Sequence, residues 1–158
     1  MRNKVLFVMD LGLFKAYRIL RDENSSSPQL TLIENFAPTG PHTKISEQFS
    51  DMSGRFGSGS TWNSAGSFGE RHNIKLELGR RIVQMFARRI NAIMRDEPPG
   101  TIIYLAAHKE MNHSLIQQLA HDVRSRVEKN LLEDLTKLHS SELLKHFGHA
   151  ERMEMAEV

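Results

Sequence analysis

Apolar and polar residues form three short patterns within the first 36 positions. Residues 5–9 are a continuous apolar run that contains two valines, and residues 14–20 and 30–36 alternate with a period close to two. Turn-forming residues separate the three segments at 10–12 and at 23–28. The pattern therefore predicts three short strands joined by short turns, which is typical of an antiparallel meander.

The periodicity changes to that of a helix after residue 72. Apolar residues recur at three- and four-residue spacing over 73–96, and the sequence DEPPG at 96–100 ends the pattern because proline disfavours helical backbone in the residue before it. Arg89 projects close to the apolar stripe, where an arginine needs an anionic partner. The apolar stripe comprises Leu78, Ile82, Phe86, Ile90, Ile93 and Met94. The opposite face carries Arg80, Arg81, Gln84, Arg88, Asn91 and Arg95.

The last third of the chain adds a strand and further helices. The unbroken apolar run TIIYLAA at 101–107 predicts a central strand, and a second amphipathic helix is predicted over 108–123. On pattern alone, residues 124–131 are compatible with either a helix or a short edge strand.

Ser140 or Ser141 is placed to cap a last helix that runs through Phe147. This order of elements predicts a single α/β domain over 1–150, with a mixed sheet and helices packed on it. The sheet would combine the three-strand antiparallel meander with a parallel βαβ part, in a ribonuclease-H-like outline. Residues 151–158 are expected to form a frayed tail.

One segment, 38–72, has a different composition from the rest. It holds six of the ten glycines and two of the five prolines, together with many serines, and it has no apolar periodicity. Ordering such a loop costs conformational entropy and buries little apolar surface. The segment is therefore either a loop that only connects two elements or the functional part of the molecule. We expect residues 56–67 to be mobile.

Composition narrows the class of protein. The chain has 158 residues, enough for one domain with a core, and no cysteine, which rules out disulfides and thiolate chemistry. No window approaches eighteen apolar residues and the N-terminus lacks the pattern of a secretory signal, so we expect a cytoplasmic protein without a membrane span. The net charge of +2 permits nucleic-acid binding without indicating it, so the positions of the charged residues are the better guide to a binding surface.

The basic residues of the Gly/Ser segment and of the following helix favour an anion-binding surface. Glycines allow close backbone approach, arginines contact phosphates, and Phe56 and Trp62 are able to stack on bases. Arg71 and His72 fall at the predicted helix start, where the free N–H groups favour an anion. The alternative is a flexible connector followed by an ordinary solvated helix face. The candidate anion- or RNA-binding residues are Arg55, Arg71, His72, Arg80, Arg81 and Arg88.

A second possible ligand site comprises Asp10, Arg89 and His108. Asp10 follows the first strand, where ribonuclease-H-like nucleases place a metal-binding acid, but a two-metal site needs further converging acids. Alternatively, Asp10 starts a turn or is the partner of Arg89. His108 follows the central strand, at the end where α/β sheets bind ligands, or is simply a residue at a helix start. The other acids available for a metal site are Glu34, Asp51 and Glu77, and no spacing selects them.

Motifs for other chemistry are absent from the sequence. The eight histidines include no His-Glu-x-x-His pattern, and GSGST at 57–61 follows no apolar strand, as a nucleophile elbow would. The chain also lacks a phosphate-binding P-loop and the dinucleotide glycine pattern. We therefore predict no metal, no cofactor and no identifiable catalytic residue.

Several longer stretches resemble one family. The chain is similar to the bacterial host attachment protein family, "required for attachment to host cells". The opening VLFVMDLGLFKAYRIL resembles that family's first hairpin, with Asp10 after the first strand. The other matching pieces are SGRF at 53–56, GERH at 69–72, the helix at 73–95, IIYLAAH at 102–108 and EDLTKLHSSELLKHF at 133–147.

That family is similar in fold to the middle domain of archaeal and eukaryotic peptide-chain release factors. In that domain a mobile loop before a long helix carries Gly-Gly-Gln, which enters the ribosome to hydrolyse peptidyl-tRNA. The loop of this chain has no Gly-Gly pair and no glutamine between Gln48 and Gln84. The resemblance thus implies the scaffold and contact with RNA or the ribosome, and it favours a short strand at 124–131.

Three functions are compatible with these features. The leading hypothesis is a binding domain, without chemistry, for tRNA, the ribosome or another phosphate-rich partner. The first alternative is an enzyme, a divergent peptidyl-tRNA hydrolase or ribosome-rescue factor. The second is a protein-interaction module that acts in the regulation of adhesion.

Overall fold

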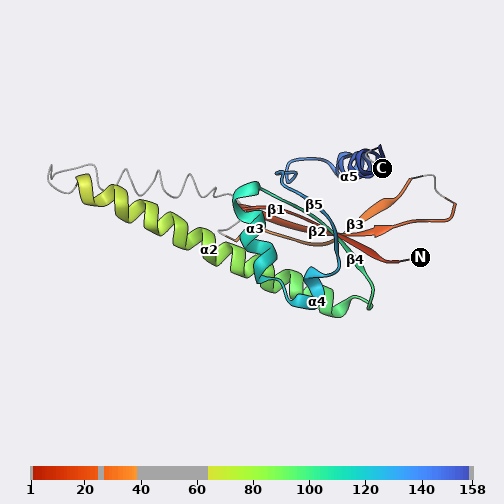
Figure 1. Cartoon of the computed structure of the whole chain (residues 1–158), viewed down its shortest axis with the longest axis horizontal. Helices are drawn as coiled ribbons and strands as arrows, with labels where there is room; N and C mark the ends of the chain where they lie inside the picture. The colour runs from red at the N-terminus through yellow and green to blue at the C-terminus, as the bar shows by residue number, and fades with distance from the viewer. Residues whose placement is uncertain (1, 25–26, 39–63, 157–158) are drawn as a thin grey trace.

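The protein forms an α/β structure built on one five-stranded sheet (Figure 1). The computed structural model describes residues 2–24, 27–38 and 64–156, with backbone alone at 64–72 and 149–156. The strands are β1 Lys4–Asp10, β2 Leu13–Leu20, β3 Gln29–Phe36, β4 Ile102–Ala107 and β5 Val127–Leu131. The helices are α2 Ser64–Asp96, α3 Lys109–Gln118, α4 His121–Arg124 and α5 Ser140–Ala156.

The sheet is mixed, as predicted, with the strand order β3-β2-β1-β4-β5. β1, β2 and β3 pair antiparallel because short turns connect them. β4 pairs parallel to β1, and β5 pairs parallel to β4, each after a helical crossover. The predicted meander and parallel part are confirmed, and β5 confirms the strand favoured within 124–131. The ribonuclease-H-like outline stays a prediction.

The two faces of the sheet carry separate hydrophobic clusters. Alternate residues of β1 point to opposite faces, so its unbroken apolar run serves both clusters. α2, α3 and α4 cover one face, and α5 covers the other, where Phe147 stacks on Tyr104 with ring centroids 5.4 Å apart. This explains why the central strands have continuous apolar sequences, whereas apolar and polar residues roughly alternate in edge strand β3.

An aromatic cluster fixes α2 on the sheet. The ring of Phe86 lies 5.2 Å from that of Phe14 and 5.8 Å from that of Phe36, measured between centroids. Phe14 also contacts Phe7 of the central strand at 6.0 Å. Phe7, Phe14 and Phe86 are completely buried, so these rings contribute both apolar area and ring–ring contacts.

Only the C-terminal part of α2 packs on the sheet. Residues 73–77 are all exposed, and full burial begins at Ile82. Figure 1 shows the N-terminal turns of α2 extending beyond the ends of the strands. At the other end, Glu97 is buried in an ion pair with Arg18 of β2, and Gly100 turns the chain toward β4 with a φ of 87°.

Three predicted helix boundaries were wrong. α2 begins at Ser64, nine residues before the predicted 73, so the C-terminal part of the Gly/Ser segment is helical. Periodicity missed this extension because these turns lie ahead of the part that packs on the sheet. Residues 39–63 of the predicted loop, with most of the expected mobile stretch, lie outside the described residues.

The other two corrections concern helix ends. The predicted helix at 108–123 is two helices, because Leu119 and Ala120 adopt extended backbone and the N–H of Ala120 donates to Asn91 Oδ1 at 3.1 Å. The last helix continues to Ala156 rather than ending at Phe147. The side chain that contacts its start is His139, not a serine, since the N–H of Ser141 donates to the Nδ1 atom of His139 at 3.5 Å.

We expect Phe86→Ala to lower the free energy of unfolding by about 3–5 kcal/mol, because it leaves a cavity among packed rings. The matched control is Met85→Ala on the exposed side of the same helix turn, which should change it by less than about 0.5 kcal/mol. Urea unfolding followed by circular dichroism measures both. Equal losses in the two variants would contradict the anchoring role of the cluster.

Candidate functional site

α2 presents three arginines of the predicted anion-binding set on its exposed surface. Arg80, Arg81 and Arg88, here called the arginine face, are all exposed. Within the described residues, no acid lies within ion-pair distance of Arg80 or Arg88. Arg81 Nε lies 3.4 Å from Glu77 Oε1 one turn earlier, and both side chains are mainly exposed. Such a pair contributes about 0.3–0.5 kcal/mol, so it leaves Arg81 available to a stronger partner.

The regular helix sets the spacing of these charges. Arg81 and Arg88 are seven residues apart, which places them on the same side of α2 about 10 Å apart along its axis. Arg80 adjoins them on the neighbouring flank. The arginine face is therefore a line of positive charge along a rigid rod rather than a concave pocket.

The remaining residues of the predicted anion site have different positions. Arg55, Phe56 and Trp62 lie outside the described residues. Arg71 and His72 lie within α2, well past its start at Ser64. The prediction that they form a helix N-terminal anion site is wrong, because N–H groups beyond the first turn are already bonded within the helix.

Arg89 has an anionic partner, as its position beside the apolar stripe requires, but this partner is not Asp10. Its Nε donates to Glu34 Oε2 on edge strand β3, so the alternative that Asp10 pairs with Arg89 is wrong. Arg89 lies at the flank of the apolar stripe with its side chain about half exposed. The pair ties α2 to β3, and Arg89 is thereby neutralised and separate from the arginine face.

Asp10 instead belongs to a polar cluster with Asp134 and Thr136, here called the β1-end cluster. Asp10 Oδ1 accepts the N–H of Gly12 at 2.8 Å, which confirms the predicted turn, and Oδ2 lies 3.2 Å from Thr136 Oγ1. Asp134 Oδ1 accepts the N–H of Thr136 at 3.0 Å and is 2.7 Å from its hydroxyl. Lys15 Nζ donates to the carbonyl oxygen of Thr136 at 2.9 Å.

The hydrogen bonds of Thr136 determine the ionisation of Asp134. Partial burial alone would raise the pKa of Asp134, but the hydroxyl and backbone N–H of Thr136 stabilise the carboxylate, with further help from Asp10 and Lys137. The pKa of Asp134 is therefore lowered from its ordinary value. The cluster pins segment 133–138 against the end of β1.

Within the described residues, the β1-end cluster is not part of a metal site. Glu34 pairs with Arg89, Glu77 pairs with Arg81, and Asp51 lies outside the described part. The described ranges contain no group of three or more potential metal-ligating side chains. Of the acids proposed to accompany Asp10, the two that are described, Glu34 and Glu77, are therefore engaged elsewhere.

His108 lies at the C-terminal end of β4, as predicted, and begins α3. Its Nδ1 accepts the N–H of Glu110 at 3.4 Å, which is the geometry of a helix cap. The preceding residue, Ala107, pairs in register with Met9, so His108 and Asp10 follow neighbouring parallel strands. No hydrogen bond or ion pair joins the two side chains in the described structure. Arg89 is paired with Glu34 instead, and a ligand site at Asp10 and His108 stays a prediction.

Sequence reasoning missed Asp134 and Thr136. Their spacing, an acid two residues before a threonine, is a signal for a side-chain turn. Leu131, Leu135 and Leu138 also have helical spacing, which obscures this signal. The pairing with Asp10 depends on a contact across 126 positions, which no local pattern contains.

We expect Asp134→Asn to lower the free energy of unfolding by about 1 kcal/mol at pH 7, since it keeps the shape but removes the charge that Thr136 stabilises. The folded-state pKa is depressed, so this stabilisation is present above the unfolded pKa and is lost as the pH falls through the folded pKa. Urea unfolding between about pH 7 and pH 3 should show the two proteins converging. Glu128→Gln, an exposed change on β5, is the control, and a constant difference at all pH values would contradict the assignment.

Within the described residues, no helix combines the length and apolar character needed to cross a bilayer. Comparison with curated proteins gave no match. A family model described as "Protein required for attachment to host cells" matches residues 5–147, which includes every strand of the sheet and the part of α5 that packs on it. The chain therefore belongs to the family of proteins required for attachment to host cells.

Proposed function

We propose that this host-attachment-family protein is a non-catalytic, cytoplasmic binding domain whose arginine face engages a phosphate-rich partner, with RNA in the form of tRNA or the ribosome as the first candidate. The observation that carries the proposal is the pair Arg80 and Arg88, which are exposed and have no acidic partner among the described residues. Exposed guanidinium groups without partners are suited to bidentate contacts with phosphate oxygens.

The use of charge elsewhere on the protein supports this assignment. Arg18 and Arg89 have partners in Glu97 and Glu34, so basic residues that fix the fold are neutralised. Among the described residues, Arg80 and Arg88 make no such contact. With respect to this part of the chain, their charge is therefore free for intermolecular use.

The shape of α2 favours an extended partner. A helix of 33 residues is about 50 Å long, and its N-terminal turns project beyond the sheet (Figure 1). A line of arginines on such a rod suits the backbone of a nucleic acid better than a small enclosed ligand. The likeness in element order to the release-factor middle domain, where a loop before a long helix enters the ribosome, favours RNA among polyanions.

The test is binding of purified protein to fluorescent tRNA and co-sedimentation with ribosomes, each at several salt concentrations. Arg80→Ala/Arg81→Ala/Arg88→Ala should weaken binding at low salt and reduce the slope of log K against log salt, by roughly 0.9 for each lost phosphate contact. The matched control is Arg2→Ala/Arg21→Ala/Lys109→Ala, which removes the same charge from exposed positions away from the arginine face.

Loss of binding in both triple variants would mean that net charge alone acts, and it would contradict an assigned face. The absence of salt-dependent binding to tRNA or ribosomes by the unaltered protein would favour a protein-interaction module. Release of peptide from peptidyl-tRNA by the purified protein would favour the hydrolase alternative and contradict a function without chemistry.

A further inference from the structure

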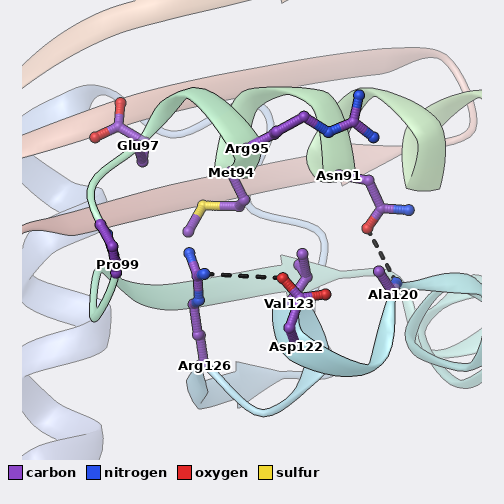
Figure 2. Close-up of a pocket in the computed structure, with 9 residues that line it drawn as sticks. All are labelled: Asn91, Met94, Arg95, Glu97, Pro99, Ala120, Asp122, Val123 and Arg126. Atoms are coloured by element: carbon purple, nitrogen blue, oxygen red, sulfur yellow. Dashed lines mark hydrogen bonds and ion pairs between the residues drawn. The ribbon is translucent and has the colours of Figure 1, made fainter.

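A cavity of about 300 Å³ lies between the C-terminal part of α2 and the α4–β5 connection (Figure 2). Its apolar lining includes Met94 and Val123, which are almost completely buried, together with Pro99. Its polar lining includes Asn91, Asp122 and Arg126. Since one molecule of liquid water occupies about 30 Å³, the cavity has room for a small organic molecule with solvent at its open side.

Arg126 lines this cavity and carries an unsatisfied hydrogen-bond donor. Its Nη1 atom is buried and has no hydrogen-bond partner among the described residues. Its Nη2 atom lies 3.8 Å from Asp122 Oδ2, which is an ion pair but too long for a good hydrogen bond. Figure 2 shows the side chain extending from the start of β5 toward the sulfur of Met94. Buried guanidinium nitrogens without an acceptor are rare in folded proteins, so this guanidinium group is suited to an anionic ligand.

The other charged residues around the cavity do not supply that acceptor. Glu97 lines the cavity, but its carboxylate is turned away from Arg126 and is bonded to Arg18 (Figure 2). Asp122 is mainly exposed and reaches only the outer nitrogen of Arg126. The backbone carbonyl oxygen of Arg126 itself is already used, because it accepts the N–H of Ile103 at 2.9 Å.

We propose that this cavity is a binding site for a small monocarboxylate, with the carboxylate on the guanidinium group of Arg126 and a short apolar chain against Met94 and Val123. A planar carboxylate matches the fork of the guanidinium group. A second negative charge would be repelled by nearby Asp122, which favours a monoanion over a phosphate dianion. Asn91 adds a donor at the other end of the cavity, because its Oδ1 is used by Ala120 while its Nδ2 donates to nothing in the described part of the chain.

The site is separate from the arginine face, since none of Arg80, Arg81 and Arg88 lines it. Arg126 is held before β5 by its backbone hydrogen bonds, so its position does not depend on a ligand. The two proposals therefore succeed or fail independently of each other.

The test is an NMR titration of the full chain with sodium butyrate, read from the methyl signals of Met94 and Val123 and the side-chain N–H signals of Arg126. We expect saturable shifts with half-saturation on the order of millimolar, as suits a ligand of so few atoms. Butylamine and 1-butanol carry the same apolar chain without the carboxylate and should give no saturable shift. Sodium phosphate should bind at least tenfold more weakly than butyrate.

Variants assign the contact to one side chain. Arg126→Met removes the donors while keeping much of the volume, and it should weaken butyrate binding at least tenfold. Arg126→Lys keeps the charge without the fork and should give an intermediate affinity, and Arg21→Met at an exposed strand end should change nothing. Because Nη1 is unsatisfied in the folded protein, Arg126→Met should leave thermal unfolding nearly unchanged.

Three results would overturn the site. Unshifted signals with butyrate would mean that water alone occupies the cavity. Equal saturation by butyrate and 1-butanol would mean an apolar cavity without an anion site. Undiminished butyrate binding by both Arg126 variants would place the carboxylate elsewhere.

Discussion

The contact between Phe86 of α2 and the rings of Phe14 and Phe36 determines where the long helix lies. It joins the helix to β2 and β3, while the adjoining apolar residues of α2 face β1 and β4. Because burial begins at Ile82, the helix has a buried half that follows this residue and a projecting half that precedes it. The buried half carries the hydrophobic core and the α4–β5 cavity at its end. Residues 73–77, Arg80 and Arg81 of the projecting half are exposed, so charge is placed there without disturbing the core.

The acids of the protein are distributed in a way that follows from this division. Glu34 and Glu97 both lie beside the buried half, where each neutralises an arginine that would otherwise be costly to place against the sheet. Among the described acids, Glu77 is the one that reaches the arginine face, and its pair with Arg81 is exposed and weak. Within the described residues, the strongly placed ion pairs thus lie beside the buried half of α2. Arg80 and Arg88 have no acidic partner in this part of the chain.

The sequence predicted much of the fold because the relevant signals are local. Continuous apolar runs and period-two alternation located β1 to β4, and the short turns implied the antiparallel meander. β5 was ambiguous on pattern, and the family resemblance favoured it as a strand. Helix ends were predicted less well, because they depend on contacts that the pattern does not contain. Ser64 starts α2 in a segment without apolar periodicity, and the break at Leu119 relies on a hydrogen bond from Ala120 to Asn91, 29 positions away.

The candidate sites were harder to predict than the helix ends, for the same reason. Arg80, Arg81 and Arg88 could be placed on one exposed surface because helical geometry alone determines it. The partner of Arg89 could not be chosen between acids, since Glu34 is 55 residues distant and Asp10 is equally plausible on sequence grounds. Asp134 gave only the signal of a local turn and Arg126 gave none, because their roles arise only when β1, α2 and β5 are assembled. A local pattern therefore predicts a surface along one element, but not a site formed between elements.

The projecting half of α2 connects stability with the proposed binding function. Helices without tertiary packing are marginal in water, and residues 73–77 are all exposed. A polyanion that lies along Arg80 and Arg81, just after these residues, would supply contacts that the sheet does not. The lack of packing on the sheet that makes this part of the helix unfavourable in isolation thus also favours an anionic partner.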